Sequence, residues 1–129
     1  MSKGPAVIDA SALLALIFDE PLSVAREAFE SGIISTVNLA EVLTKMAEVG
    51  VVAADGLADV EALGLNLTIV DFDSDAAIGS ADLRAGTRHL GLSLGDRACL
   101  AVARSRTLPV LTADRAWMKL EGFTVVPVR

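Results

Sequence analysis

The sequence has one cysteine, one histidine and no tyrosine, and these scarcities exclude several kinds of site. Its only cysteine, Cys99, cannot form an intramolecular disulfide or a cysteine-rich zinc site, and the apolar stretch around it predicts a small buried side chain. With His89 as the only histidine, a zinc, copper or iron site has too few suitable ligands. Acid–base catalysis by a pair of histidines is likewise unsupported, because only one histidine is present. His89 precedes Gly91 at an expected helix end, so we predict a surface or capping residue there.

Long apolar runs are also missing, although the chain is rich in apolar residues. No run approaches the roughly 18 residues that a membrane span needs, and the segment before Asp9 is too short for a signal-peptide core, so we expect a cytoplasmic protein without membrane contact. Hydrophobic residues make up 53% of the sequence, and the mean hydropathy of +0.55 is high for a small soluble protein. We therefore expect some apolar area to be buried against another chain.

Positive charge is in short supply overall, but it is unevenly distributed. The net charge of −6 counts against a groove that binds nucleic acid by positive charge alone. Eight of the eleven Lys and Arg residues lie from Arg84 onward, and that half of the chain offers phosphate contacts. Each of these residues taken singly is also explained by a solvated helix face or a local ion pair.

Short β-branched runs alternate with longer segments of helical period, which predicts a single α/β domain over residues 1–129 with a mostly parallel sheet of about five strands. The candidate strands are Ala6 to Asp9, Ile33 to Thr36, Thr68 to Asp71, Pro109 to Thr112 and Thr124 to Val128. The candidate helices are Ser11 to Phe18, Leu22 to Glu30, Val37 to Val49, Ala54 to Leu63, Asp75 to Arg88, Leu94 to Arg104 and Asp114 to Leu120. Parallel strands joined by helices gather their carboxyl ends along one edge, where open α/β sheets bind ligands.

Four acidic residues fall at that edge. Asp9 closes the first strand, Glu41 follows the second by five residues, Asp96 lies in the first turn of a helix, and Asp114 comes two residues after the fourth strand. All four therefore have positions from which they can face one shared site.

Each of these acids also has an explanation that involves no site, because carboxylates near helix N-termini cap free backbone N–H groups. Asn38 with Glu41, and Ser93 with Asp96, match the spacing of a capping box. Helical facing separates two of the acids. Asp96 shares a helical stripe with Leu100 and Ala103, so we expect it to face the protein interior, where an unpaired carboxylate is costly. Glu41 lies on a mostly polar face, so helical periodicity does not single it out.

The other two acids are expected to be partly shielded from water. Asp9 ends a buried strand, and Asp114 shares a helix face with Trp117 and Met118. Carboxylates that converge without positive charge repel one another, and a hard divalent cation with oxygen ligands relieves that repulsion. Mg²⁺ or Mn²⁺ fits such a donor set best.

At these residues the chain resembles the PIN-domain family, and within it the VapC toxins of prokaryotic toxin–antitoxin modules. The matching segments, in order, are VIDASALLAL at residues 7–16, ISTVNLAEVL at 34–43, LSLGDRACLA at 92–101 and LTAD at 111–114. The likeness covers nearly the whole chain, and four motifs in this order are more specific than any one of them.

The resemblance implies a metal site made by Asp9, Glu41, Asp96 and Asp114, which supplies the support for Glu41 that its helical face does not. Ser11 and Thr112 match the hydroxyl residues that commonly line this site, and Asn38 matches a polar position near it that capping explains equally well. Arg97 and Arg115 stand beside two of the acids and are candidates for holding a substrate phosphate. Asp71 and Asp73 have no counterpart in the family and are assigned to capping.

The resemblance further implies cleavage of RNA by metal-activated water, with a second copy of the chain and a small VapB-like antitoxin as partners. A helix stripe such as Leu39, Val42, Leu43 and Met46 is a candidate contact surface, although such stripes are more often core. Two non-catalytic alternatives remain. A magnesium-binding receiver domain expects an acidic pair after the first strand and a lysine at a late strand end, whereas Asp9 stands alone and Lys119 lies inside the last helix. An RNA-binding PIN fold without catalysis is weakened because all four acidic positions are filled.

Overall fold

Five short strands form one parallel sheet in the order β3-β2-β1-β4-β5. The structure is a computed structural model, and it describes residues 5–129. The strands are β1 (Val7–Ile8), β2 (Ile33–Ser35), β3 (Thr68–Val70), β4 (Val110–Thr112) and β5 (Val125–Pro127). Each lies within an apolar run that predicted it, and all neighbouring pairs are parallel, so the expected sheet is confirmed. The three inner strands are fully buried, as continuous apolar strands covered on both faces should be.

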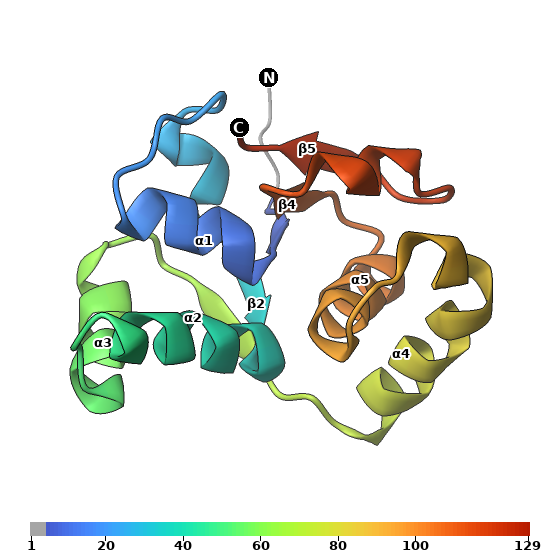
Figure 1. Ribbon diagram of the computed structural model, residues 1–129, viewed down its shortest axis with the longest axis horizontal. Coiled ribbons are helices and arrows are strands. Elements are labelled where there is room, and N and C mark those ends of the chain that lie inside the picture. The colour runs from blue at the N-terminus through green and yellow to red at the C-terminus, as the bar shows by residue number, and fades with distance from the viewer. Residues whose placement is uncertain (1–4) are drawn as a thin grey trace.

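Helices cover both faces of this sheet. Figure 1 shows α1 (Ala10–Ile17), α2 (Thr36–Glu48) and α3 (Ala53–Ala62) on one side, with α4 (Ser74–Thr87) and α5 (Leu94–Arg106) on the other. One core lies under the first group and includes Leu13, Phe29 and Val42. A second core lies under α5 and includes Leu100 and Trp117.

The strand order places a topological switch point at β1. The chain leaves β1 toward β2 on one side, while β4 pairs on the other side of β1 after the crossover through α4 and α5. Ligands of open α/β sheets bind beyond the carboxyl ends of the strands at such a point. Asp9 directly follows β1, so it lies at this position.

One expected helix is wrong. Residues 22–30 do not form an α-helix; the only helical part is the short 3-10 helix η1 (Arg26–Phe29). The Ser23 backbone N–H donates to the Val128 carbonyl at 2.7 Å, and its hydroxyl donates to the Pro127 carbonyl at 3.1 Å. These bonds to the end of β5 replace the intrahelical bonds that the sequence pattern predicted.

The other helices agree with the expected segments within two residues, except that residues 114–120 form a 3-10 helix, η3 (Arg115–Lys119), rather than an α-helix. A further 3-10 turn, η2 (Arg88–Leu90), ends at Gly91, which adopts a left-handed conformation with φ of 61°. His89 is exposed on η2 and Cys99 is buried, as expected.

The stripe on α2 is core, not contact surface. Leu39, Val42 and Met46 are buried beneath the helix, and Leu43 packs against the same cluster. Large apolar side chains that are exposed lie elsewhere: Phe18, Val49, Val52, Ile69, Ile78, Leu94 and Met118. Within residues 5–129, no helix has both the length and the apolar character needed to cross a membrane.

Candidate metal centre

Asp9 is the buried member of the acidic group, with 5% of its surface exposed. It occupies the N-cap position of α1, but its side chain makes no capping bond. Its Oδ2 instead accepts hydrogen bonds from the Ser11 hydroxyl at 2.6 Å and the Thr112 hydroxyl at 2.9 Å. Both hydroxyl residues expected beside the site therefore contact Asp9, one from α1 and one from the end of β4.

The backbone after β4 fixes these hydroxyls. The Ala113 N–H donates to the Ser11 oxygen at 2.9 Å, and the Asp114 N–H donates to the Thr112 oxygen at 3.1 Å. Since each hydroxyl accepts a backbone bond, its own proton is free to point at Asp9. The loop that carries Asp114 thus orients the Asp9 carboxylate indirectly.

Burial raises the pKa of Asp9 from its ordinary 3.8 to about 6, because the charged form loses contact with water. The hydrogen bonds from Ser11 and Thr112 lower this pKa. The negative charges of Asp96 and Glu41 raise it further, so both carboxylates are close enough to act on Asp9.

Glu41 lies against the start of α5. Its Oε1 accepts a hydrogen bond from the Asn38 amide at 3.0 Å, and the same amide nitrogen donates to the Gly95 carbonyl at 2.9 Å. Gly95 leaves the space that the carboxylate fills: a Cβ there would lie 2.7 Å from the Glu41 Cδ and closer still to Oε2. α2 and α5 therefore pack closely together where the buried Asn38 amide contacts Gly95, which has no side chain.

The capping box predicted from the spacing of Asn38 and Glu41 does not form. Ser35 caps α2, accepting from the Val37 N–H at 3.2 Å, and this places Asn38 inside the helix with a fully buried side chain. Asn38 Oδ1 is buried without a hydrogen-bond partner in the described structure. An unpartnered buried oxygen beside a carboxylate is a costly arrangement that a cation or a water molecule would relieve.

Asp96 forms the other expected capping box, and this one is present. The Ser93 hydroxyl accepts from the Asp96 N–H at 3.1 Å, and Asp96 Oδ2 accepts from the Ser93 N–H at 3.0 Å. Asp96 is half-buried rather than turned fully inward. Asp96 therefore caps α5 and also lies close enough to Asp9 for its charge to act on that carboxylate.

Asp114 is more exposed than expected. Its Oδ1 accepts from the Ala116 N–H at 3.0 Å, which caps η3. Asp114 is not among the charges that shift the pKa of Asp9. Its place at the site rests on the strand edge and on its backbone bond to Thr112.

Neither arginine beside these acids contacts them. Arg97 donates from Nη1 to the Ser80 carbonyl of α4 at 3.0 Å, and its Nε is buried without a partner. Arg115 donates to the Arg129 carbonyl at 3.1 Å. Asp73 caps α4 as expected, whereas the side chain of Asp71 makes no capping bond.

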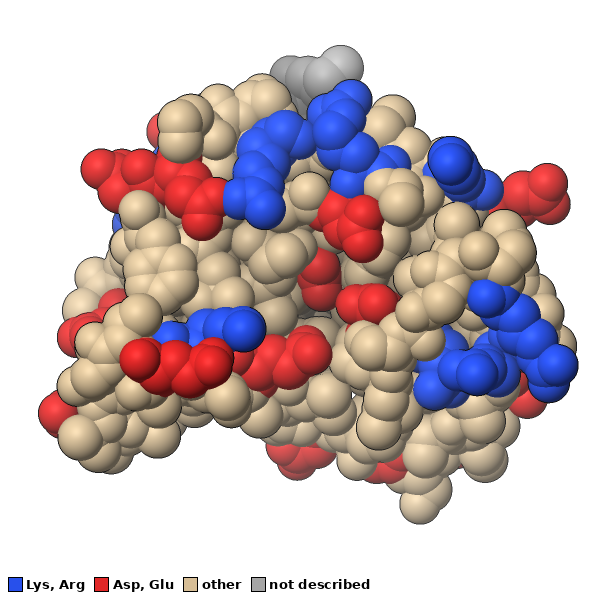
Figure 2. Space-filling view, in the orientation of Figure 1, with Lys and Arg blue, Asp and Glu red and all other residues tan. Residues whose placement is uncertain are grey.

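Acidic side chains gather on one part of the surface. Figure 2 shows acidic side chains in the centre of this face, between the two groups of helices, with lysine and arginine side chains above and to the right of them. The ion pairs within residues 5–129 are Lys45 with Glu48 and Arg129 with Glu20, so none of the four acids is neutralised by a cationic side chain. Beneath them, burial and the charges of Asp9, Asp96 and Glu41 raise the pKa of the Cys99 thiol, which stays neutral and is no nucleophile.

The donor set fits a hard divalent cation. In each of the four carboxylates one oxygen accepts the hydrogen bonds described above, and the other accepts none within residues 5–129. The hydrogen bonds therefore anchor each side chain while an oxygen ligand remains available. Within the described residues, no three acidic, histidine or cysteine side chains already stand together closely enough to hold a metal ion.

Sequence reasoning missed two contributors, Asn38 in its actual role and Gly95. The only signal was the pattern of an amide three residues before Glu41 and a glycine directly before Asp96. Neither pattern reveals that the two segments touch, because they are 57 residues apart in the chain.

Comparison with known proteins identifies the fold family. The model of the PIN domain family matches residues 6–122. Among solved structures, the DNA-bound VapBC from Salmonella typhimurium has 22% identity and a TM-score of 0.70, over 95% of this chain and 97% of that one. VapBC-5 from Mycobacterium tuberculosis has 27% identity and a TM-score of 0.59, over 97% and 98%. A toxin–antitoxin complex from Klebsiella pneumoniae has 24% identity and a TM-score of 0.67, over 94% and 95%.

A search of curated proteins found no match. The family match nevertheless spans the segments that carry all four acids and most of both cores. The chain belongs to the PIN domain family.

Proposed function

We propose that this protein is a metal-dependent endoribonuclease and the toxin of a VapBC-type toxin–antitoxin pair. The observation that carries the proposal is the group of carboxylates at the switch point of the sheet, which lacks a cationic partner and keeps one oxygen of each acid available. Membership of the PIN family and the likeness to VapBC structures support the same reading.

Mg²⁺ or Mn²⁺ held by Asp9, Glu41, Asp96 and Asp114 would supply an activated water and positive charge for phosphodiester hydrolysis. The protein contributes the orientation of these groups. Ser11 and Thr112 hold Asp9, Asn38 holds Glu41 against Gly95, and the Ser93 N–H holds Asp96. Attack by water on RNA leaves a 3′-hydroxyl and a 5′-phosphate, so the histidine-poor composition is no obstacle.

The proposed partners are a VapB-like antitoxin that blocks the site and a second copy of the chain. The similar solved structures are toxin–antitoxin complexes. The exposed apolar side chains on several elements provide area that such partners would bury. The proposed place of action is the cytoplasm, where RNA is accessible.

The test is cleavage of total RNA by the purified protein, with Mg²⁺, with Mn²⁺ and with EDTA. We expect Asp9→Asn and Asp96→Asn each to lower the rate by at least about a hundredfold, since each removes a charged ligand from the site. Asp73→Asn is the matched control, because Asp73 also bonds a backbone N–H at a helix start but lies outside the site. Cleavage ends should carry 5′-phosphates and should disappear with EDTA.

Full cleavage by both Asp9→Asn and Asp96→Asn would overturn the proposal. The remaining alternative, a PIN domain that binds RNA without cutting it, predicts RNA binding by the wild-type protein with no Mg²⁺-dependent ends. The receiver-domain alternative is set aside, because the chain belongs to the PIN family.

A further inference from the structure

The two edge strands of the sheet, β3 and β5, differ in how their outer sides are protected. In β5, the outward residue Pro127 has no N–H to offer, and its carbonyl accepts a hydrogen bond from the Ser23 hydroxyl at 3.1 Å. β3 pairs with β2 on one side, and no strand within residues 5–129 pairs with its other side. β3 is therefore the open edge of the sheet.

The open backbone groups of β3 are those of Ile69. The Thr68 N–H donates toward β2, to the Gly32 carbonyl at 2.8 Å. Because backbone groups alternate in direction along a strand, the N–H and C=O of Ile69 point away from the sheet. The strand reads Thr-Ile-Val, without the lysine or proline that commonly protects an edge, and the Ile69 side chain is 42% exposed. Such an edge is a template for another strand.

Hollows open on both faces of the sheet beside β3. The first has a volume of about 160 Å³ and is lined mainly by apolar side chains, among them Ile34, Leu39, Val60 and Ile69. The second has a volume of about 380 Å³ and is lined by Val70 together with residues of α4 and α5. Ile69 pairs with Ile34 of the first core, whereas Val70 packs against the second core, so these neighbours face opposite hollows. A strand added to β3 would place successive side chains in the two hollows alternately.

The part of the chain that contains β3 is acidic. Residues 46–83, which include α3, β3 and most of α4, contain no lysine, arginine or histidine. Their acidic residues are Glu48, Asp55, Asp59, Glu61, Asp71, Asp73, Asp75 and Asp82. Glu61 lines the apolar hollow, and Asp71, Asp73 and Asp75 line the larger one.

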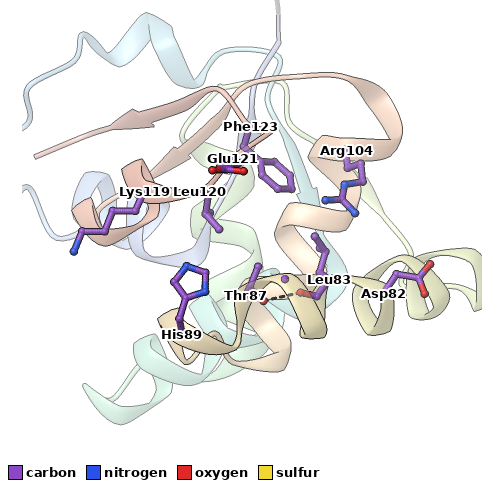
Figure 3. A pocket seen from close by; sticks show the side chains of 10 residues that line it. Asp82, Leu83, Thr87, His89, Arg104, Lys119, Leu120, Glu121 and Phe123 are labelled. Atoms are coloured by element: carbon purple, nitrogen blue, oxygen red, sulfur yellow. Dashed lines mark hydrogen bonds between the residues drawn. The ribbon is translucent and has the colours of Figure 1, made fainter.

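Two arginines, Arg104 and Arg106, also line the larger hollow. The Arg104 guanidinium lies 5.3 Å from the centre of the Phe123 ring, and Figure 3 shows these two side chains next to each other along a different hollow. Neither arginine forms an ion pair with an aspartate in the described part of the chain. Even with both arginines counted, the three aspartates give the larger hollow a negative balance of charge.

We propose that the β3 edge is a docking site for an extended, basic segment of a partner protein, which adds an antiparallel strand to the sheet through the backbone of Ile69. An apolar side chain of the added strand enters the hollow beside Ile34, and the next side chain, a basic one, meets Asp71 and Asp75. Antiparallel edge strands on otherwise parallel sheets are common, and backbone bonds with alternate side-chain pockets are the usual basis of such docking.

Charge argues against a second copy of the chain as the occupant. Antiparallel pairing of two β3 strands about Ile69 sets Asp71 of each copy opposite Leu67 of the other, in a segment that has no basic residue to meet the acids. None of the four candidate metal ligands lines either hollow, so this surface does not depend on the nuclease function.

The test is the fluorescence anisotropy of a fluorescein-labelled peptide, Arg-Val-Arg-Leu-Arg, titrated with the full chain at low salt. We expect Ile69→Lys to weaken binding by at least about tenfold, because a positive charge on the edge repels the basic strand. Ile78→Lys is the matched control, since Ile78 is exposed on α4 and lines neither hollow. It should change the affinity by less than about threefold.

A second pair of variants tests the charge. Asp71→Asn combined with Asp75→Asn should weaken peptide binding by about fivefold or more, because two ion pairs are lost. Asp55→Asn combined with Asp59→Asn removes the same charge from α3, outside both hollows, and should change the affinity by less than about twofold. Circular dichroism checks that each variant is folded, and the aspartate pair carries the test if Ile69→Lys does not fold.

The backbone bonds have their own readout. The Ile69 N–H should exchange with solvent at least about tenfold more slowly when the peptide is bound, as measured by NMR. A peptide with N-methylated valine and leucine keeps its charge but cannot pair through these amides, and should bind at least about tenfold more weakly.

Three outcomes would overturn the proposal. The first is an equal loss of binding in Ile69→Lys and Ile78→Lys, or in the two aspartate pairs. The second is undiminished binding of the N-methylated peptide, which would mean attraction by charge alone. The third is a wild-type dimer that becomes a monomer in Ile69→Lys by sedimentation velocity, since a second copy would then occupy the edge.

Discussion

Asp9 combines burial with a charge that nothing nearby neutralises. Two hydroxyl donors hold its Oδ2, yet loss of hydration dominates and the pKa of this carboxyl is raised to about 6. In the folded protein without metal, Asp9 thus holds its proton more tightly than in the unfolded chain. Its ionised form at neutral pH is a cost to folding, and a bound cation would relieve that cost.

Replacing Asp9 by Asn should therefore stabilise the metal-free protein at neutral pH. The folded pKa is above the unfolded value of 3.8, so the contribution of Asp9 to stability is lost as pH rises from about 4 to 6. The shift of about two pKa units corresponds to a gain of up to about 3 kcal/mol for Asp9→Asn at neutral pH, and almost none at about pH 4. Asn Oδ1 can still accept from Ser11 and Thr112. Urea unfolding in EDTA at both pH values measures this, and a less stable Asn variant at neutral pH would contradict it.

Gly95 gives a prediction that separates metal binding from stability. In Gly95→Ala the new methyl group meets the Glu41 carboxylate, so Glu41 must leave its bond with Asn38 or tilt away from α5. Alanine favours the helix by up to about 1 kcal/mol, which offsets part of the strain. We expect a free energy of unfolding within about 1 kcal/mol of wild type in EDTA, and a weaker gain in melting temperature on adding Mg²⁺.

The control for Gly95→Ala is Gly79→Ala in α4, whose nearest contact would be 3.4 Å from the Ala101 Cβ. This variant should keep the full Mg²⁺ response in thermal unfolding. An equal loss of that response in both variants would show that the space beside Glu41 has no bearing on metal binding.

The site itself was only partly predictable from the sequence. Asp96 could be singled out by its helical face, because a carboxylate in an apolar stripe is costly unless a cation or hydrogen bonds compensate its charge. Glu41 could not, since its face is polar and the space that its carboxylate fills is left by Gly95 on another helix. Asn38 looked like a cap, but the cap is Ser35, and local spacing does not reveal which of two polar residues starts the helix.

At the scale of elements, the first turn of α5 has a structural and a chemical role. Ser93 and Asp96 satisfy each other's backbone N–H groups, while Asp96 also adds its charge to the acidic group. Ser93→Ala should lower the free energy of unfolding by about 1 kcal/mol, the usual cost of a lost N-cap. Cleavage should persist, because the Ser93 N–H that holds Asp96 is a backbone group.

Asp73→Ala provides the comparison for this helix, since it removes the cap of α4, and Asp73 is not among the charges that act on Asp9. Urea unfolding should give a similar loss of stability for both variants. If Ser93→Ala also abolishes cleavage while Asp73→Ala does not, the hydroxyl cap and not only the backbone bond positions Asp96.

Strands and most helices could be predicted because their signals are local. The inner strands are short apolar runs, and α2, α4 and α5 carry helical periodicity. The helix predicted from Leu22 to Glu30 does not form, because the Ser23 N–H and hydroxyl donate to the carbonyls of Val128 and Pro127, more than a hundred residues later. Hydrogen bonds between such distant parts of the chain cannot be predicted from a local residue pattern.

At the scale of the whole molecule, charge is arranged as an acidic centre with basic groups around part of it (Figure 2). The net charge of −6 opposes a polyanion at long range, and the unneutralised carboxylates oppose it at the point of contact. Affinity for RNA must then depend on what neutralises the centre. The basic residues of the second half of the chain provide attraction only beyond it.

RNA binding should consequently depend on divalent cations even before any bond is cut. At low ionic strength in EDTA, we expect wild-type protein to bind a short RNA about tenfold more weakly than in the non-cleaving divalent ion Ca²⁺, because hard cations reduce the charge of the acidic centre. Asp96→Asn should bind more tightly than wild type in EDTA, since one repelling charge is gone, and should respond less to Ca²⁺. Asp73→Asn removes the same charge outside the centre and should behave as wild type. Anisotropy titrations measure all three, and identical wild-type affinities with and without divalent ions would mean that RNA does not pass over the acids.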